Sequence, residues 1–449
     1  MQQTIPTSSD AANAERLLIS AVLNSGELKP AMEAGVTPDM FSAYRTEWED
    51  LVSRTERRKG QVPLTADFLR TWGNSVALDS TDDVAFYADQ VRTLWATNVL
   101  RSQMLDAASL TETGSEANLR RALEGLHSVV KTINRTIEPV QSFSLKGNTS
   151  AIEAEVARRF KAAQANGGSA GIPFGRPTLD QYTGGKIGSL FAIVAARTNV
   201  GKSWELLCWA LAAAQAGKRV AFFSLEMDSF AVALRLLAIE SYQNRSSVNF
   251  DPGALAKGQI DKALGQSFGQ WLRDLSSRLP GEIEIIDRRR GSVTTATVAA
   301  TCDKYQPDEL YVDGIQILKP SRRLGQQAAD WQAVAEVSAD LFDIAGEGGI
   351  PVIASSQINR TQVSHNMPPD LENLSRSDAI AQDADLVVTM TDYTPNTWRV
   401  KIAKNRLGGG KGTIYHMAFQ PQLGRIEEIT ANEAEMMRSM IPINGGLQP

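Results

Sequence analysis

The residues best suited to chemistry lie in the segment AARTNVGKS, Ala195 to Ser203. An apolar run of strand length precedes it, and a stretch of helical spacing follows and stops at Gly217. In this setting Gly-Lys-Ser forms a phosphate-binding loop, with backbone N–H groups facing phosphate oxygens, the lysine reaching the β- and γ-phosphates and the serine binding Mg²⁺. The sequence predicts a nucleotide site made by Ala196, Arg197, Thr198, Asn199, Val200, Gly201, Lys202 and Ser203.

Three further polar residues end apolar runs downstream. Asp313 closes the run LYVD and is expected to hold Mg²⁺, with a helix cap as the alternative. Glu226 follows FFSL and could polarise the water that attacks the γ-phosphate, or could cap the next helix. Gln357 ends VIASSQ and could read the γ-phosphate through its amide, or could be a solvated loop residue. Parallel sheets place such strand ends at their ligand-binding edge.

The elements that must position these residues are strands alternating with helices after Gly171. Continuous apolar runs predict strands buried on both faces, and hence a largely parallel sheet. The last two runs alternate more and are joined by RLGGGKG, which predicts a hairpin. The expected strands are Leu190–Ala195, Arg219–Ser224, Glu282–Ile286, Leu310–Asp313, Pro351–Ser355, Asp385–Met390, Trp398–Lys404 and Thr413–Phe419.

The first 135 residues have helical spacing throughout, with Asp10 as the expected N-cap of the first helix. Their aromatic residues Phe41, Trp48, Phe68 and Trp72 are expected to be core. Residues 136–171 read as a linker, within which Ala151–Ala165 forms an amphipathic helix. Its apolar stripe is expected to dock on another subunit, or else back on its own chain.

Composition excludes several classes of protein. The chain has 449 residues, 43% hydrophobic and 22% charged, as in ordinary globular proteins. The absence of a long apolar run or a signal segment predicts a cytoplasmic protein without a membrane partner. Two cysteines, Cys208 and Cys302, offer neither a disulfide framework nor a zinc site. A net charge of −5 restricts nucleic-acid binding to a localised basic surface.

The order of these segments resembles a known family. SLEM, YVDGIQIL, SSQINR, AQDADLVV and KNR follow AARTNVGKS as in the motor domain of the DnaB-type replicative helicases. GIPFGRPTLDQYTGG resembles the start of that domain, and the helical first part is similar in size and pattern. The resemblance is dense in the motor and weak in the first 135 residues.

The resemblance implies an α/β, RecA-like ATPase domain at 172–430, preceded by an all-α collar domain at 1–135 and a linker helix, with a tail at 431–449. It implies a homo-hexameric ring that uses ATP and Mg²⁺ for 5′→3′ translocation on single-stranded DNA, with primase and a loader as partners. Glu226 is then the catalytic carboxylate, Gln357 the γ-phosphate sensor and Asp313 a metal residue. Lys404 and Arg406 are presented to the neighbouring subunit's nucleotide; read alone, they are two charges on one face of an edge hairpin.

The loop that holds DNA in this family departs from the usual pattern here. The family usually has LRESGSIEQDAD, whereas this chain has LSRSDAIAQDAD, from Leu374 to Asp385. Ser375 and Arg376 are the expected DNA contacts, although Asp378 replaces a glycine where backbone approaches phosphate, and an anion there repels DNA. Arg322 and Arg323 are a second candidate for the central channel, because six copies would concentrate positive charge in a ring.

Two other functions remain alternatives at this point. A RecA-like recombinase or mediator ATPase shares the nucleotide chemistry but forms filaments on single-stranded DNA. A non-enzymatic ring scaffold would use the nucleotide only for assembly. The long helical first part and the Lys404-Asn405-Arg406 motif argue against the former, and the intact set of polar residues argues against the latter.

Overall fold

The computed structural model describes residues 8–73, 83–112, 114–137, 145–166, 168–244, 249–288, 293–321, 330–358, 367–371 and 378–440. The chain forms two compact units, Met1–Thr149 and Ser150–Pro449. In the described part, no helix is long and apolar enough to cross a membrane.

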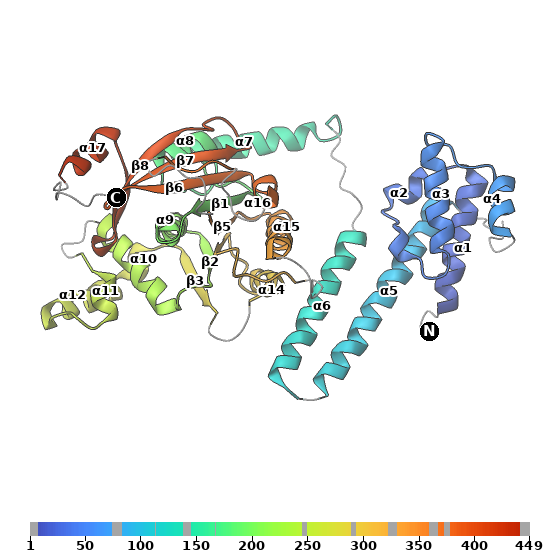
Figure 1. The fold of residues 1–449 in the computed structure, drawn as a ribbon, viewed down its shortest axis with the longest axis horizontal. Helices are drawn as coiled ribbons and strands as arrows, with labels where there is room; N and C mark the ends of the chain where they lie inside the picture. The colour runs from blue at the N-terminus through green and yellow to red at the C-terminus, as the bar shows by residue number, and fades with distance from the viewer. Residues whose placement is uncertain are drawn as a thin grey trace, which may run out of the picture. The chain divides into compact units, whose positions relative to one another are not determined.

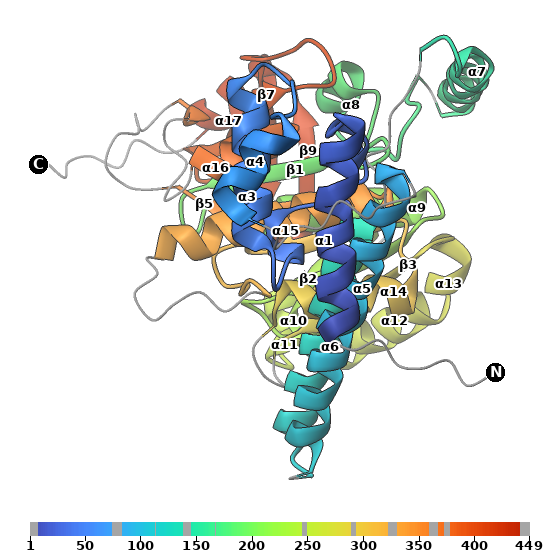
Figure 2. The same ribbon diagram turned by 90° about the vertical axis from the view of Figure 1, so that its right-hand side faces the viewer.

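The first unit is built from helices. Two of them, α5 and α6, are long and lie side by side as an antiparallel hairpin (Figures 1 and 2). The helices are α1 (Ser8–Ser25), α2 (Lys29–Glu33), α3 (Arg45–Arg57), α4 (Thr65–Trp72), α5 (Val84–Thr111) and α6 (Glu116–Ile137).

The core of this unit contains the expected aromatic residues. Phe41, Trp48 and Phe68 are buried, and Trp72 packs against the same cluster while partly exposed. The expected cap at Asp10 is wrong, because α1 begins at Ser8 and places Asp10 in its first turn. A carboxylate there still faces the positive end of the helix dipole, which explains why its sequence signal resembles that of a cap.

The described residues of the second unit are organised around one nine-stranded sheet of order β3-β2-β4-β5-β1-β6-β7-β8-β9. The strands from β3 to β6 in this order pair in parallel, and β6 to β9 pair antiparallel. The strands are β1 (Phe191–Ala196), β2 (Arg219–Ser224), β3 (Glu282–Asp287), β4 (Glu309–Asp313), β5 (Val352–Gln357), β6 (Leu386–Thr394), β7 (Thr397–Asn405), β8 (Ile414–Gln420) and β9 (Arg425–Ile429).

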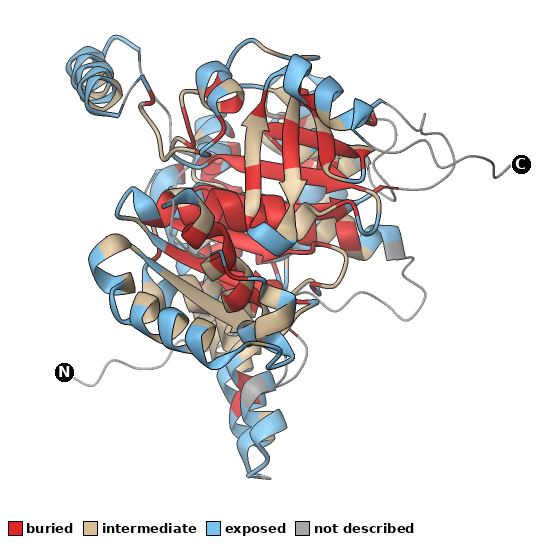
Figure 3. Ribbon diagram, turned by 90° about the vertical axis from the view of Figure 1, so that its left-hand side faces the viewer, coloured by how far each residue is buried: buried red, intermediate tan, exposed pale blue. Residues whose placement is uncertain are grey.

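Apolar clusters on both faces of the sheet make a three-layer unit. One cluster joins strand residues to α9 and α10, and the other joins them to α15. Figure 3 shows burial concentrated in the strands and the helices against them. The helices are α7 (Thr149–Ala165), α8 (Pro177–Thr183), α9 (Lys202–Gln215), α10 (Ser229–Gln243), α11 (Pro252–Ala256), α12 (Lys262–Arg273), α13 (Leu275–Arg278), α14 (Thr295–Tyr305), α15 (Asp330–Gly348), α16 (Asp378–Asp383) and α17 (Ala431–Ser439).

The predicted strands and the parallel sheet are confirmed, with ends that shift by a few residues at most. The predicted hairpin is formed by β7 and β8. It is not an edge hairpin, because β7 lies between β6 and β8, and β8 pairs further with β9. β9 was not predicted: its segment RIEEI is short and mostly charged, and it is a strand because it pairs with β8.

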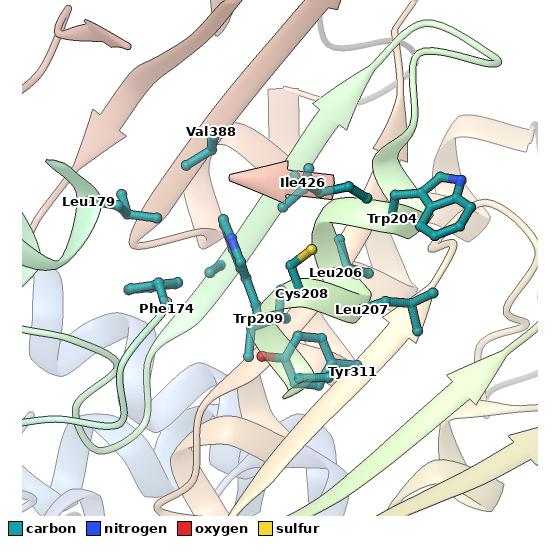
Figure 4. Close-up of a cluster of buried hydrophobic side chains, with 14 of the residues drawn as sticks. Phe174, Leu179, Trp204, Leu206, Leu207, Cys208, Trp209, Tyr311, Val388 and Ile426 are labelled. Atoms are coloured by element: carbon teal, nitrogen blue, oxygen red, sulfur yellow. The ribbon is translucent and has the colours of Figure 1, made fainter. Parts of the chain in front are cut away.

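The cysteines are free thiols. Cys208 is buried among apolar side chains beside Trp209 and Tyr311 (Figure 4), and Cys302 is partly buried. Burial raises the pKa of Cys208 to about 11 and that of Cys302 to about 12. Both are therefore protonated and unreactive near neutral pH.

A fully buried ion pair joins Lys186, which precedes β1, to Glu309 of β4. Lys186 Nζ lies 2.8 Å from Glu309 Oε1, and it donates to Tyr311 Oη at 3.0 Å and to the Trp209 carbonyl. Burial lowers the pKa of Lys186 and raises that of Glu309. Each charge is stable here mainly because the other is present.

We therefore expect Lys186→Met to lower the free energy of unfolding by about 3–5 kcal/mol near neutral pH, because it leaves the Glu309 carboxylate buried and unpaired. The deficit should shrink as the pH falls, because a carboxyl whose folded pKa is raised favours the folded state only when protonated. Urea unfolding at pH 7.5 and 5.5 measures both effects. The double variant Lys186→Met/Glu309→Leu should recover most of the loss, and a single variant as stable as wild type at pH 7.5 would contradict the prediction.

Candidate nucleotide-binding and catalytic site

The phosphate loop lies between β1, which ends at Ala196, and α9, which begins at Lys202. Two residues of the turn have positive φ, Asn199 at 66° and Gly201 at 109°. A Cβ atom on Gly201 would lie 2.3 Å from Cζ2 of Trp398 on β7, so both the backbone conformation and the space require glycine. The loop thus rests directly on an aromatic side chain of the antiparallel part of the sheet.

Lys202 lies across this loop. Its Nζ atom donates to the carbonyl of Ala196 at 3.3 Å and to that of Arg197 at 3.2 Å. Burial lowers the pKa of Lys202, while the negative charges of Asp313 and Glu226 oppose that shift. Asp313 and Glu226, which are far from the motif in the sequence, are therefore close enough in space to act on its ammonium group.

Asp313 reaches the same edge because β4 runs parallel to β2 and β5 in the centre of the sheet. Its side chain is only 2% exposed, and Oδ1 accepts a hydrogen bond of 2.7 Å from Ser355 Oγ. Oδ2 is buried without a hydrogen-bond partner. A buried, half-satisfied carboxylate beside a phosphate loop fits a hydrated Mg²⁺, whereas the alternative of a helix cap has no support in these contacts.

Glu226 lies two residues beyond β2 and is exposed. The alternative that it caps the next helix is wrong, because the N-cap of α10 is Asp228, whose carboxylate accepts from Ala231 N at 3.0 Å. The Glu226 carboxylate is thus open to solvent, and its negative charge acts on the Lys202 ammonium group. That position suits a carboxylate that orients water.

Gln357 is the last residue of β5, and it pairs in register with Ala196 of β1. Its Nε2 atom donates to Thr198 Oγ1 at 2.6 Å. The amide is thus connected to the phosphate loop itself, and a ligand on the loop would compete for this contact. The structure brings Lys202, Asp313, Glu226 and Gln357 to one edge of the sheet.

Arg235 on α10 is a further residue of the site that the sequence reading missed. Its guanidinium lies 4.9 Å from the centroid of the Trp204 ring, and Trp204 follows the phosphate-loop serine directly. Burial lowers the pKa of Arg235, and the Asp313 carboxylate opposes that shift. A single arginine inside an apolar helix carries no sequence signal.

Lys404 and Arg406 lie at the end of β7 and contact α16 of the same chain. Lys404 Nζ donates to the carbonyls of Ala381 at 2.6 Å and Gln382 at 3.1 Å. Arg406 donates to the Gln382 carbonyl at 2.6 Å and lies 3.4 Å from an Asp385 carboxylate oxygen. The described contacts of this pair are thus with the C-terminal end of a helix, where cations are favoured, rather than with the phosphate loop of their own chain.

The four expected DNA contacts, Arg322, Arg323, Ser375 and Arg376, lie outside the described residues. The described residues stop at Ser321, just before Arg322 and Arg323. They resume with α16 at Asp378, just after Ser375 and Arg376.

Within the described residues, no three acidic, histidine or cysteine side chains cluster as a ready-made metal site. Such a site is not required for Mg²⁺ in nucleotide enzymes, where one or two protein ligands and the phosphates share the ion. Ser203 at the start of α9 and Asp313 at the end of β4 are the residues that would hold it.

The sheet order, the phosphate loop after β1 and the carboxylate at the end of β4 define a RecA-like P-loop protein. Residues 171–428 match the model of the DnaB-like helicase C-terminal domain. The chain belongs to this family.

Curated relatives include a replicative DNA helicase DnaB from Geobacillus stearothermophilus, 30% identical over 263 residues, which are 56% of this chain and 54% of the relative. The replicative DNA helicase DnaC of Bacillus subtilis is also 30% identical over 263 residues, 54% of either chain. The match thus spans about half the length of these relatives.

Solved structures that share the fold include the following two. A DnaB-like replicative helicase, described with its interactions with primase, aligns with a TM-score of 0.58 at 20% identity, over 92% of this chain and 98% of that one. The second structure is an isolated ATPase domain, which aligns with a TM-score of 0.51 at 22% identity, over 64% of this chain and all of that one.

Proposed function

We propose that this chain is a replicative DNA helicase, which hydrolyses ATP to move 5′→3′ along single-stranded DNA and unwind duplex DNA as a hexameric ring. The observation that carries the proposal is that parallel strands bring Lys202, Asp313 and Glu226 to one edge of the sheet beside the phosphate loop. Family membership over residues 171–428 supports the same activity.

Each residue of the edge has a chemical task in this proposal. The backbone N–H groups of residues 197–203 and Lys202 bind the phosphates of ATP, and Glu226 orients and polarises the attacking water. Gln357 leaves Thr198 to contact the γ-phosphate, and so reports whether that phosphate is present. Mg²⁺, held by Ser203 and through water by Asp313, would draw negative charge from the phosphate oxygens.

Lys404 and Arg406 complete the site of the neighbouring subunit. Both are cations at the end of a strand. The carbonyls that accept from them are weaker partners than a phosphate, and the Asp385 carboxylate lies 3.4 Å from Arg406. Donated in trans, Arg406 stabilises the charge that develops on the transferring phosphoryl group. Hydrolysis then depends on assembly, which suits a ring that moves on DNA in steps.

DNA binding is assigned to the two segments that contain Arg322 with Arg323 and Ser375 with Arg376. Six copies of these arginines concentrate positive charge along the path of a single strand, although the chain carries a net charge of −5. Asp378 at the start of α16 makes this grip differ from the usual family pattern.

The helix α7 is the candidate for joining one subunit to the next. None of its described residues is buried, and Val156 and Phe160 are 61% and 65% exposed on one face. The second unit offers a groove of about 770 Å³ with mostly apolar lining, and we assign α7 of a second copy as its occupant. The groove is lined by residues that include Leu236, Leu237, Leu272, Leu275, Leu279 and Ile283.

We expect the double variant Val156→Asp/Phe160→Asp to weaken assembly at least about tenfold in concentration, because two charges replace the apolar contact. Analytical ultracentrifugation over a range of concentrations measures this effect. Lys161→Asp, on an exposed position of the same helix, is the control and should assemble as wild type. Unchanged assembly of the double variant would contradict the role of α7.

The direct test of the function is ATP hydrolysis with and without single-stranded DNA, run beside unwinding of a fork with a labelled 5′ tail. Hydrolysis with unwinding that requires the 5′ tail supports the helicase. Hydrolysis with filaments instead of rings in electron micrographs would favour the RecA-like recombinase, and nucleotide-dependent rings without turnover would favour the scaffold. Primase and a loader remain proposed partners, and adding them tests whether unwinding depends on loading.

A further inference from the structure

The chain leaves the sheet at Arg406 as a loop of residues 406–412. The pairing of β7 with β8 ends near Lys401, while on the side of β6 the Arg406 N–H group still donates to the Asp385 carbonyl at 2.8 Å. Gly410 is partly buried, and the other residues of the loop are exposed. Burial of apolar side chains therefore contributes little to the conformation of this loop, which depends on hydrogen bonds and close backbone contacts.

The Asn405 side chain closes a turn around Arg406. Its Oδ1 atom accepts from Leu407 N at 3.0 Å, and its Nδ2 atom donates to the Gly409 carbonyl at 2.9 Å. Nδ2 also donates to the carbonyl of Tyr182 in α8 at 3.3 Å. A carbonyl in the last turn of a helix has no partner within that helix, and Asn405 supplies a donor to it. One amide group thus fixes the turn and joins it to α8.

The Tyr182 side chain contacts the same loop at Gly410. A Cβ atom on Gly410, whose φ is 82°, would lie 2.4 Å from Cγ and 2.9 Å from Cβ of Tyr182. These atoms are close to the backbone of α8 and cannot move away without the helix. Both the backbone conformation and the contact therefore require glycine here, and the loop lies directly against α8.

Asn405 points away from the two cations that flank it in the sequence. Consecutive residues of a strand point to opposite faces, and Lys404 contacts carbonyls of α16 whereas Asn405 contacts α8. Arg406 contacts α16 as Lys404 does. Asn405 thus holds the chain that follows Arg406 from the opposite side of the strand.

We infer that Asn405 is a positioning residue for Arg406, and that α8, through Tyr182, is the support against which it acts. The sheet fixes Arg406 on its N-terminal side, and the turn made by Asn405 fixes the chain on its C-terminal side. Without this turn, the guanidinium reaches the neighbouring nucleotide from a wider range of positions, and fewer of them stabilise the transferring phosphoryl group. This inference rests on the proposed helicase function, and in particular on Arg406 acting in trans.

The first test measures phosphate release by assembled Asn405→Ala over a range of ATP concentrations. We expect turnover at saturating ATP to fall about tenfold, because a displaced catalytic group loses much of its effect. The KM for ATP should stay within about twofold, since the phosphate loop of the same chain is unchanged. Asn396→Ala is the matched control, because Asn396 directly precedes β7 and its described hydrogen bonds are made by its backbone.

A second test mixes Asn405→Ala chains with Lys202→Ala chains. Where an Asn405→Ala chain binds the nucleotide and a Lys202→Ala chain presents its Arg406, both contributions to the site are intact. Turnover per chain should therefore rise above that of Asn405→Ala alone. If Asn405 acted on the nucleotide of its own chain, the inactive Lys202→Ala chains would instead lower turnover by dilution.

A third test uses two glycines of the loop to separate the contact with Tyr182 from backbone strain. Gly410 and Gly412 have φ values of 82° and 88°, and a Cβ atom on Gly412 would meet no described atom within 4 Å. Alanine is therefore strained at both positions, but it displaces Tyr182 only at Gly410. We expect Gly410→Ala to turn over at least about threefold more slowly than Gly412→Ala, with a similar KM for ATP.

Unchanged turnover in Asn405→Ala would overturn the inference and leave the proposed function intact. Turnover that falls on mixing with Lys202→Ala chains would also overturn it, and equal turnover of the two glycine variants would overturn the role of Tyr182. If Asn405→Ala does not assemble, the glycine pair decides. Wild-type assemblies that do not hydrolyse ATP would instead refute the proposed function, and the inference with it.

Discussion

Lys202→Ala should reduce ATP hydrolysis to below about 1% of the wild-type rate, because it removes the ammonium group that lies across the phosphate loop. The loss should appear with and without single-stranded DNA, and unwinding should disappear with it. A steady-state assay of phosphate release at saturating ATP measures the effect.

Two controls separate this effect from damage to the fold. Lys257→Ala removes an exposed lysine just after α11 and should leave turnover unchanged. The urea unfolding midpoint of Lys202→Ala should stay near or above that of wild type. The substitution removes an ammonium group whose charged form is destabilised by partial burial. Turnover above a tenth of the wild-type rate would contradict the assigned role of Lys202.

Arg406→Ala should lower turnover by about a thousandfold while sparing nucleotide binding and assembly. The guanidinium contacts α16 of its own chain rather than the phosphate loop, so its loss leaves the local nucleotide pocket unchanged. Binding of a fluorescent ATP analogue and ultracentrifugation measure the two spared properties, and phosphate release measures the lost one. Arg273→Ala, on an exposed position of α12, is the matched control.

Mixed assemblies distinguish a role in trans from a role in cis. If Arg406 serves the neighbouring subunit, mixing Lys202→Ala chains with Arg406→Ala chains creates some boundaries at which both contributing residues are intact. Hydrolysis should therefore recover partly in the mixture, although each variant alone is inactive. No recovery in assemblies shown to be mixed, or normal turnover by assembled Arg406→Ala rings, would rule out the trans assignment.

Much of the second unit could be predicted because its central strands are continuous apolar runs between clear helix and turn signals. The same reading reached Lys202 through its Gly-Lys-Ser motif. It reached Asp313, Glu226 and Gln357 because each follows such a run, and parallel pairing brings strand ends to one edge. Position within the sheet was harder to predict. β9 was missed, and β7 lies inside the sheet, because strand order depends on pairing between distant segments.

The residues that the sequence reading missed act through contacts without a local pattern. Arg235 lies over Trp204 because α10 packs beside α9, and Tyr182 contacts Asn405 because the loop after β7 lies against α8. The need for glycine at residue 201 has a similar origin. The motif predicts the glycine, but only the structure shows that Trp398 occupies the space of a side chain.

The contact between Gly201 and Trp398 gives β7 two roles at once. Trp398, in its first half, packs against the phosphate loop of its own subunit. Its second half carries Lys404, six residues further along the same strand. Six residues of an extended strand span about 20 Å. In a ring, β7 would therefore lie near the nucleotide of its own subunit at one end and near the next subunit's nucleotide at the other. The six sites would then be coupled in series.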